Sequence, residues 1–346
     1  MTIRFATPSE TTDWNNHILQ NADGGNIFQS QEFAQQKQQS GWTPRYIVTG
    51  DTAMTVLQKH IIGLGNHWYI PKGPGVIDVV QLQTLLPELR QFARQNNVFS
   101  VKIEPEIIDS EDARIELNNL ELIRTTPIQP NAATVNVNLN ESLDEIMAHL
   151  NQKGRHAINR ARRDGVTIAA VDSSDENCQI MYRLLADTAA GSFRIRSYDY
   201  YRTFWQRYAD VSKGQLFFAY VDGQIVAGAY AMIFGTKSTY KDGASIRDRT
   251  TYGASHLLQW SVIEWAKSRG ALTHDLCGTP SAANIKDQTD PYYGLGRFKT
   301  SFNKQVTDYI GAYDLIIKPA SYRIWTNIGE RITLRLHTIR HHENWW

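Results

Sequence analysis

The pattern of apolar residues follows the same order twice along this chain: helix, strands, helix, strand. In the first run, strands at Pro44–Thr49 and Thr52–Ile61 precede a helix at Val79–Gln95. In the second run, a hairpin at Leu216–Phe234 precedes a helix that begins near Tyr252. Apolar residues recur about every 3.6 residues in helices and every second residue in strands. The repeated order predicts two similar α/β units of roughly 150 residues each, which suits a chain longer than one core usually supports.

Size and composition exclude several classes of protein. The chain has 346 residues, of which 42% are hydrophobic and 21% charged, as in an ordinary globular protein. A net charge of +1 argues against a general nucleic-acid binder but leaves room for a local basic surface. Cys178 and Cys277 are too few for a disulfide framework, and no Cys/His cluster has zinc spacing. With no signal peptide and no long apolar run, we expect a cytoplasmic protein without a metal.

A basic stretch at Lys153–Gly165 has the spacing of a helix closed by a glycine. Lys153 and Arg160 fall toward one side of this helix, while Ala157 and Ile158 face the other way. The stretch could be an ordinary solvated helix face. It could equally be an anion surface for the phosphates of a ligand or of an RNA backbone. Both interpretations stay open from the spacing alone.

The segment around Arg196 combines an arginine with tyrosines at the start of a predicted helix. If the helix begins at Ser197, Arg196 lies at its start and Tyr200 follows one turn later. An arginine fork and a tyrosine hydroxyl suit a diphosphate or a carboxylate, and helix N-termini favour anions. The alternative is that the arginines pair with Asp199 and Asp210 on the surface.

The segment Gly294–Phe302 contains two glycines and a lysine between phenylalanines. The glycines let the backbone approach a ligand, and Phe298 and Phe302 would share one helical face. Lys299 would then point elsewhere, where a fixed ammonium group can stabilise the oxyanion of an acyl-transfer intermediate. A lysine beside a phenylalanine is also common on surfaces. Cys277, although near a histidine, is expected to be a small buried hydrophobe rather than a nucleophile.

Seven segments stand out together: Gln29–Lys37, Tyr69–Pro74, Val101–Pro105, Lys153–Val166, Tyr240–Ser245, Asp275–Gly278 and Gly294–Phe302. With these segments, the sequence resembles the FemABX family of peptidoglycan aminoacyltransferases over nearly its whole length. Each matching segment is modest, but all seven occur in the family's order, which makes the resemblance specific.

The resemblance implies two GNAT-like domains, each a mixed twisted sheet flanked by helices, of α/β (α+β) class and without a coiled-coil arm. We expect residues 1–140 and 316–346 to form the first domain, to which the C-terminal segment returns and which binds the precursor. Residues 141–315 would form the second domain, which carries aminoacyl transfer.

The resemblance also implies the reaction. An amino acid would pass from aminoacyl-tRNA to the stem-peptide amino group of UDP-MurNAc-pentapeptide or lipid II, forming the interpeptide bridge. Such an aminoacyltransferase needs no cofactor, and we expect a monomer, with peripheral association at the inner membrane face. By motif, Lys37 and Arg196 would hold the substrate's diphosphate, with Tyr200 and Tyr240 as neighbouring substrate-binding residues. Phe298 and Lys299 would be catalytic, with Lys299 stabilising the oxyanion. The basic helix would contact tRNA weakly, through Lys153, Arg155 and Arg160.

Two departures and two alternatives accompany this prediction. Glu104 stands where the family often has an aspartate, so a base role there is in doubt, and no long helical hairpin is inserted.

A GNAT-fold N-acyltransferase that uses acyl-CoA is one alternative, yet its pyrophosphate loop would need more glycines than Arg249–Ala254 offers. The other alternative is a non-catalytic relative that binds the precursor or RNA.

Overall fold

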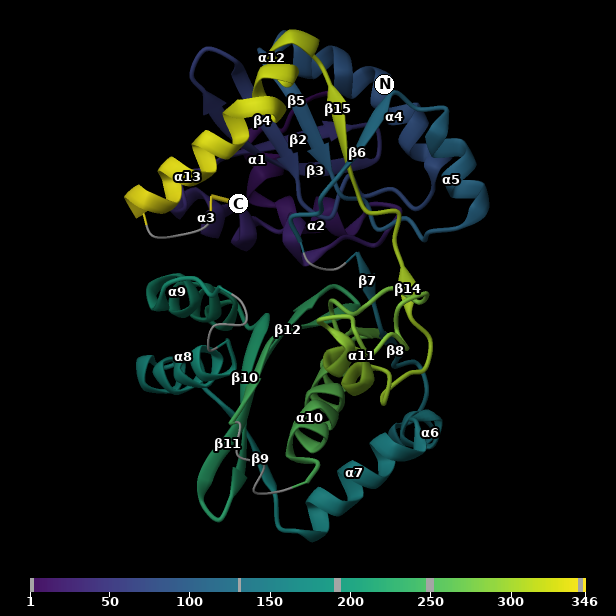
Figure 1. Ribbon diagram of the computed structural model, residues 1–346, viewed down its shortest axis with the longest axis vertical. Helices are drawn as coiled ribbons and strands as arrows, with labels where there is room; N and C mark the ends of the chain where they lie inside the picture. Colours follow the sequence, from purple (N-terminus) through teal and green to yellow (C-terminus); the bar gives the residue numbers. More distant parts are fainter. Residues whose placement is uncertain (1–2, 130–131, 190–193, 247–251, 342–344) are drawn as a thin grey trace. The chain divides into compact units, whose positions relative to one another are not determined.

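A computed structural model describes residues 3–129, 132–189, 194–246, 252–341 and 345–346. The chain divides into two compact units (Figure 1). The first comprises residues 1–132 and 308–346, and the second comprises residues 133–307. The expected boundaries after residues 140 and 315 therefore need correction. The reason is sheet membership: β8 (Asn136–Asn138) lies in the second unit's sheet, and β15 (Ala312–Ile316) lies in the first unit's sheet.

Among its described residues, the first unit has a seven-stranded sheet in the order β1-β2-β3-β4-β5-β15-β6. Its further strands are β1 (Arg4–Phe5), β2 (Thr43–Thr49), β3 (Thr52–Ile61), β4 (Gly65–Ile70), β5 (Val98–Ile103) and β6 (Leu122–Thr125). Its helices are α1 (Pro8–Thr12), α2 (Trp14–Leu19), the 3-10 turn η1 (Ile27–Gln29), α3 (Gln31–Gln39), α4 (Val79–Gln95), α5 (Glu111–Asn118), α12 (Pro319–Ile324), the π turn η2 (Trp325–Gly329) and α13 (Glu330–His341).

The described part of the second unit has a six-stranded sheet in the order β8-β13-β12-β11-β10-β9. Its further strands are β9 (Thr167–Val171), β10 (Gly214–Val221), β11 (Gln224–Phe234), β12 (Lys237–Ser245) and β13 (Thr273–Asp275), while β7 (Ala133–Thr134) pairs with β14 (Thr307–Asp308). Its helices are α6 (Leu143–His149), α7 (Gln152–Arg163), α8 (Asp175–Ala189), α9 (Tyr198–Asp210), α10 (Ala254–Ser268) and α11 (Tyr293–Lys299).

The two sheets share one connection pattern. In the first unit, β2, β3 and β4 are antiparallel, and helix α4 then leads to β5, which runs parallel to β4. In the second unit, β10, β11 and β12 are antiparallel, and helix α10 leads to β13, parallel to β12. The parallel strand of each sheet then pairs antiparallel with a strand that is distant in sequence: β5 with β15, and β13 with β8. The prediction of two similar units with mixed sheets is confirmed.

Helices cover both faces of each sheet, as a mixed sheet with two apolar faces requires. In the second unit, α10 and α7 pack on one face of the sheet, where they share a core that includes Trp260 and Ile263. Helices α8 and α9 contact strands of the same sheet separately from that core. The longest described helices of the second unit, α8 and α10, have 15 residues each, so the prediction of a compact form without a coiled-coil arm is confirmed for the described part. No helix among the described residues is long and apolar enough to cross a bilayer.

Helix α10 begins against the backbone of α7. Gly253, its N-cap, has a φ of +86°, and a Cβ there would lie 2.2 Å from the carbonyl oxygen of Ala157. Gly270, just after the same helix, also has a φ of +86°, but a Cβ there would meet nothing within 4 Å. The first glycine is therefore required by both conformation and space, and the second by conformation alone.

Substituting these two glycines separates the two requirements. We expect Gly270→Ala to lower the free energy of unfolding by about 1–2 kcal/mol, the cost of a left-handed non-glycine residue. Gly253→Ala should lower it further, by about another 1–3 kcal/mol, because α7 and α10 must move apart. Urea unfolding followed by tryptophan fluorescence measures both values. Equal losses for the two variants would contradict the close approach of the helices.

Candidate functional site

The end of strand β13 is shaped by the Asp275 carboxylate. Its Oδ1 accepts a hydrogen bond from the backbone N–H of Cys277 at 2.7 Å and another from the Thr134 hydroxyl. The same hydroxyl lies 3.1 Å from the Cys277 carbonyl oxygen. Cys277 adopts a left-handed conformation, with a φ of +62°. An aspartate that bonds to the backbone two residues on is a turn device, so the chain turns directly after β13.

Lys299, the predicted oxyanion stabiliser, lies at this turn. Its side chain comes from the last residue of α11, and only 4% of the residue is exposed. Its Nζ donates a hydrogen bond of 2.6 Å to the carbonyl oxygen of Gly278. Burial lowers the pKa of Lys299, and the charges of Cys277 and Asp275 oppose that shift. The ammonium group is therefore fixed in a shielded place rather than on the surface.

Phe298 and Phe302 anchor α11, as their spacing predicts. The two ring centroids are 5.4 Å apart, and the ring of His256 lies 5.0 Å from Phe298 and 5.8 Å from Phe302. Burial lowers the pKa of His256 to about 4, so this histidine is neutral near pH 7 and acts as a packing group. The predicted loop contains a short helix, and its second glycine, Gly296, is close-packed: a Cβ there would lie 2.7 Å from Ile285 Cδ1.

Tyr240 belongs to the face of the sheet that α7 and α10 cover. Its ring packs against their core and its pKa is raised, mainly by burial and further by the charges of Asp242 and Cys277. The phenol is therefore protonated at neutral pH and can donate a hydrogen bond.

Arg196 and Tyr200 lie together at the start of α9. Helix α9 begins at Tyr198, with Ser197 as its N-cap, as the sequence predicts. The guanidinium carbon of Arg196 is 4.4 Å from the ring centroid of Tyr200, a cation–π distance. This pair carries a positive charge and an aromatic hydroxyl at one helix start, a combination that suits an anion.

Lys241 and Asp242 are functional candidates that the sequence analysis missed. Lys241 Nζ lies 3.1 Å from the Asp242 carboxylate and 5.3 Å from the ring of Phe204 on α9. The other Asp242 oxygen accepts a hydrogen bond of 2.9 Å from Trp205 Nε1. The pairing of β12 with β11 shifts register between Tyr240 and Asp242, so Lys241 occupies a bulge and reaches α9. The sequence Tyr240–Asp242 gave no sign of that bulge.

Lys37 lies in the first unit, whereas Arg196, Tyr200 and Tyr240 belong to the second. It sits on α3, is 4% exposed, and places its Nζ 5.3 Å from the ring centroid of Phe33. A lysine this deeply buried is unusual and is a common feature of functional sites. Its predicted contact with the diphosphate stays a prediction.

The predicted tRNA-contacting residues of α7 fall into two groups. Arg155 donates to the carbonyl oxygens of Ala148 and Leu150 at 2.6 and 2.5 Å, and thereby caps the end of α6. Arg160 pairs with Asp164 at 3.2 Å, yet 52% of its side chain is exposed. Lys153 is exposed. The structure gives Arg155 an architectural use and leaves Lys153 and Arg160 at the surface.

Glu104, where a base role was in doubt, is buried in the first unit. One of its carboxylate oxygens accepts from the Tyr69 hydroxyl at 2.7 Å, and the other accepts from the backbone N–H of Ile128. Burial raises its pKa, and these hydrogen bonds and Lys72 oppose the shift. Both carboxylate oxygens of Glu104 are therefore engaged in hydrogen bonds that fix the surrounding structure.

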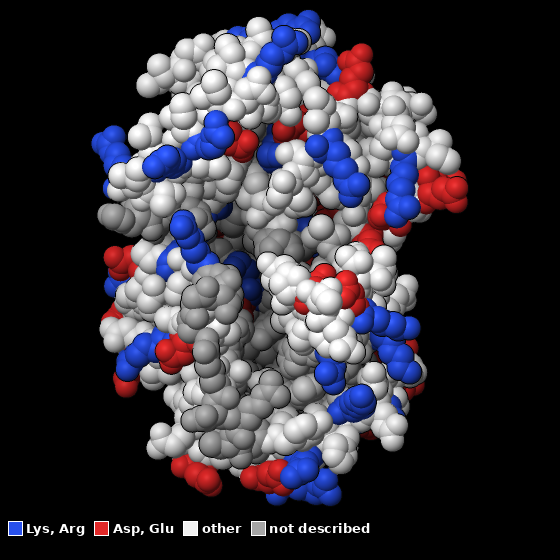
Figure 2. All heavy atoms as spheres, viewed as in Figure 1, with Lys and Arg blue, Asp and Glu red and all other residues white. Residues whose placement is uncertain are grey.

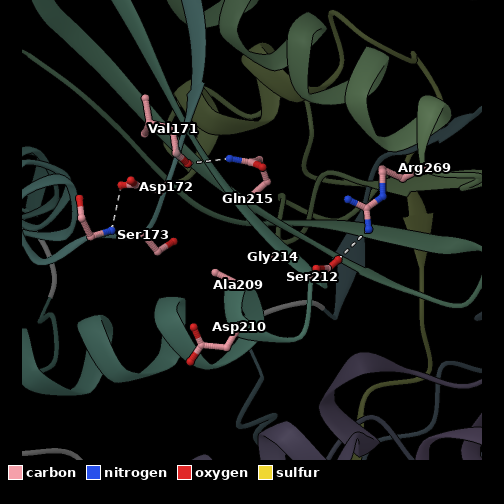
Figure 3. Close-up of a pocket in the computed structure, with 10 residues that line it drawn as sticks. Val171, Asp172, Ser173, Ala209, Asp210, Ser212, Gly214, Gln215 and Arg269 are labelled. Carbon is pink, nitrogen blue, oxygen red and sulfur yellow. Dashed lines mark hydrogen bonds between the residues drawn. The ribbon is translucent and has the colours of Figure 1, made fainter.

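A cavity of about 470 Å³ lies in the second unit, near the ends of β9 and β10 (Figure 3). Arg269, which donates to the Ser212 carbonyl at 2.9 Å, and the carboxylates of Asp172 and Asp210 line it. None of the predicted site residues lines this cavity, so it is separate from the Lys299 turn. Within the described part of the chain, no three His, Cys, Asp or Glu side chains are placed to hold a metal. Half of the disfavoured pyrophosphate segment, residues 249–251, lies outside the described residues.

Comparison with known proteins gives consistent results. The sequence matches the FemAB family over residues 10–125, 116–224 and 215–329. The lipid II:glycine glycyltransferase of Staphylococcus epidermidis (strain ATCC 35984) is 20% identical over an alignment of 409 residues, covering 93% of this chain and 95% of that protein. The enzyme of the same name from Staphylococcus aureus is 30% identical over 112 residues, which cover 32% of this chain and 26% of that protein.

Solved structures share the fold. The crystal structure of FemX superposes with a TM-score of 0.80 and 19% identity, covering 94% of this chain and 99% of that one. L-PGS from Bacillus licheniformis gives a TM-score of 0.55 and 14% identity, covering 95% and 98%. A tandem GNAT protein from clavulanic acid biosynthesis gives 0.50 and 11%, covering 92% and 98%. The family match spans most of both units, and the chain belongs to the FemAB family.

Proposed function

We propose that this protein transfers an amino acid from aminoacyl-tRNA to the stem-peptide amino group of a peptidoglycan precursor, and so forms an interpeptide bridge. That it is an aminoacyltransferase follows from the family and from relatives that align along nearly its whole length. The relative from Staphylococcus epidermidis is named for glycine transfer to lipid II, which supports a precursor of that type as acceptor. The observation that carries the proposal is the buried Lys299 ammonium group at the Gly278 turn.

The chemistry needs a stabilised oxyanion more than a strong base. The acceptor amine attacks the ester carbonyl carbon, a C–N bond forms, and the carbonyl electrons move to oxygen. The tetrahedral intermediate then expels the ribose oxygen of tRNA, which takes up the proton that the amine releases, directly or through water. An ammonium group has three N–H donors, and Gly278 occupies one of them at Lys299. The remaining donors can hold the oxyanion without reorganisation.

The other residues fall into binding roles in this proposal. Lys37, Arg196, Tyr200 and Tyr240 hold the diphosphate of UDP-MurNAc-pentapeptide or lipid II, and Phe298 packs against the transferred aminoacyl group. Lys153 and Arg160 contact the tRNA backbone through their exposed charges. The first unit binds the precursor and the second unit carries the transfer. Because charged tRNA occurs in the cytoplasm, we place the reaction there.

The start of α10 argues against an acyl-CoA donor. A GNAT-fold enzyme binds the CoA pyrophosphate with backbone N–H groups that open a helix. Here the backbone carbonyl oxygen of Ala157 is directed against the N-cap of α10, within 2.2 Å of a Cβ placed on Gly253. A carbonyl oxygen offers no hydrogen bond to a pyrophosphate and repels its charge. The position therefore favours helix packing over anion binding.

The reaction can be tested by incubating the protein with charged tRNAs and either form of the precursor. We expect the precursor to gain the mass of one aminoacyl residue, and Lys299→Met to reduce that transfer rate at least a hundredfold, because removal of one oxyanion donor costs about 2.7–4 kcal/mol. Mass spectrometry of the precursor measures the product. Precursor affinity should change little.

A matched control is Lys304→Met, which removes an exposed lysine five residues further along the second unit. It should leave transfer unchanged. Unchanged turnover in Lys299→Met would contradict the oxyanion role. If the wild-type protein transferred nothing from any charged tRNA, a non-catalytic binding protein would be favoured instead.

The proposed diphosphate contacts predict a loss of precursor affinity. We expect Arg196→Met and Lys37→Met each to weaken binding of the UDP-linked precursor by about 1–3 kcal/mol, the usual range for a charge-assisted hydrogen bond. Isothermal titration measures the Kd. Arg183→Met, which removes an exposed arginine from α8, serves as the control and should bind normally. If the affinity of both variants matches the control, the diphosphate assignment is wrong.

The lowered pKa of Lys299 predicts a pH dependence. Only the protonated ammonium group stabilises an oxyanion, so transfer should fall as the pH rises through a pKa below the ordinary 10.5. The unfolded chain binds this proton up to the ordinary value, so between the two pKa values stability rises with pH. An NMR titration of ¹³C-labelled lysine, with the resonance assigned from its absence in Lys299→Met, measures the pKa. A midpoint at or above 10.5 would contradict the buried site.

A further inference from the structure

The C-terminal helical segment of the first unit presents a regular exposed face of aliphatic and basic side chains. Helices α12, η2 and α13 follow one another without a break from Pro319 to His341. Along them, pairs of neighbouring exposed residues recur every four positions. The pairs are Arg323–Ile324, Asn327–Ile328, Arg331–Ile332, Arg335–Leu336 and Ile339–Arg340. Ile332, Leu336 and Ile339 are 50%, 61% and 62% exposed.

The π turn reduces the rotation of these pairs around the helix axis. In a regular α-helix a repeat of four residues drifts by about 40° at each step, so five pairs would spiral around the axis. The wider turn at Trp325–Gly329 takes up an extra residue and offsets part of that drift. π turns are rare and often occur at functional sites. The five pairs therefore turn less far around the axis than they would in a regular α-helix.

Two buried tryptophans flank α13 in the sequence and pack against the first unit. Trp325 and Trp345 are 3% and 5% exposed, and their ring centroids are 5.7 Å apart. Trp345 also packs 5.0 Å from Trp42, whose Nε1 donates to the Trp345 carbonyl at 3.3 Å. The opposite side of α13, at 333–334 and 337–338, is partly buried. Helix α13 therefore has one fixed face inward and one outward.

The outward face is positively charged and uncovered. Residues 319–341 contain four arginines against one glutamate, whereas the whole chain has a net charge of only +1. Within the described part of the chain, the guanidinium groups of Arg331, Arg335 and Arg340 have no ion pair or hydrogen bond. Blue side chains lie among white ones along the segment that Figure 1 labels α13 (Figure 2).

We propose that this face of α12, η2 and α13 binds the surface of an anionic lipid bilayer, with the helix axis in the plane of the membrane. Aliphatic side chains flanked by arginines are the composition of helices that lie in the interface. The arginines would pair with lipid phosphates while Ile332, Leu336 and Ile339 enter the acyl boundary. A second copy of this chain fits poorly, because its own arginines would oppose these. The inference stands on this surface and does not require the proposed transfer reaction.

Flotation with lipid vesicles tests the proposal on the full chain. Wild-type protein should float with vesicles of phosphatidylglycerol and phosphatidylcholine, and much less with phosphatidylcholine alone. We expect the triple variant Ile332→Ser, Leu336→Ser, Ile339→Ser to lose at least tenfold in partitioning. The matched control Ile77→Ser, Val80→Ser, Ile115→Ser removes side chains that are 52%, 57% and 56% exposed. Ile77 lies just before α4, Val80 in α4 and Ile115 in α5, and Figure 1 shows these two helices on the other side of the first unit from α13. The control substitutions should therefore leave vesicle binding unchanged.

A second triple variant, Arg331→Gln, Arg335→Gln, Arg340→Gln, tests the charge separately. It should lose the preference for phosphatidylglycerol and the salt dependence of binding, at an unchanged melting temperature. Three outcomes would overturn the proposal: no flotation of wild type with anionic vesicles, unchanged flotation of both helix variants, or an equal loss in the α4 control. Gel filtration that shows a dimer which the serine variant dissolves, without lipid binding, would assign the face to a second copy instead.

Discussion

The hydrogen bonds of the Asp275 carboxylate set the geometry on which the candidate site depends. They join the end of β13 to Thr134, a residue more than 140 positions earlier, and to the backbone N–H of Cys277. With these bonds in place, Cys277 can hold a left-handed conformation that a non-glycine residue otherwise avoids. The carbonyl of Gly278 then meets Lys299 Nζ. The lysine has a fixed position because the carboxylate fixes the turn.

The environment of Lys299 differs from those of two other buried lysines. Lys102 and Lys72 in the first unit form ion pairs with Asp314 at 3.1 Å and Glu106 at 3.4 Å. The hydrogen-bond acceptor of Lys299 is a backbone carbonyl, which carries no formal charge. An ammonium group that is buried without a direct carboxylate contact retains much of its desolvation penalty. Such a group gains most when a negative charge develops beside it, as an oxyanion does.

Most helices and strands, and their order along the chain, could be predicted because the local periodicity of apolar residues indicates each element. Boundaries between the units were less accessible. Strands β8 and β15 join sheets through partners that lie far along the chain, and no local pattern reveals which sheet a short strand enters. Local contacts within the site were accessible. Phe298 and Phe302 are four residues apart, so their contact could be predicted from the sequence.

The unpredicted site residues all depend on non-local pairs or on backbone irregularities. Asp242 receives a hydrogen bond from Trp205, and Lys241 reaches α9 only because β12 contains a bulge. Arg155, by contrast, was predicted to contact tRNA weakly, and in the fold its guanidinium group caps α6. Residue type and spacing identify which side chains can do chemistry, while the tertiary fold decides which are already used to hold the structure.

The position of β15 has a consequence for how the chain is made. β15 lies between β5 and β6 in the first sheet, and β6 has β15 as its ladder partner in the described part of the chain. On a ribosome, residues 1–132 emerge first, yet their sheet lacks the strand that joins β6 to β5 until residues 312–316 have been synthesised. The second unit is contiguous and can complete its own sheet earlier. During synthesis, residues 1–132 therefore expose an unpaired edge of β5 until β15 is made. Chaperone binding in that period would protect them from aggregation.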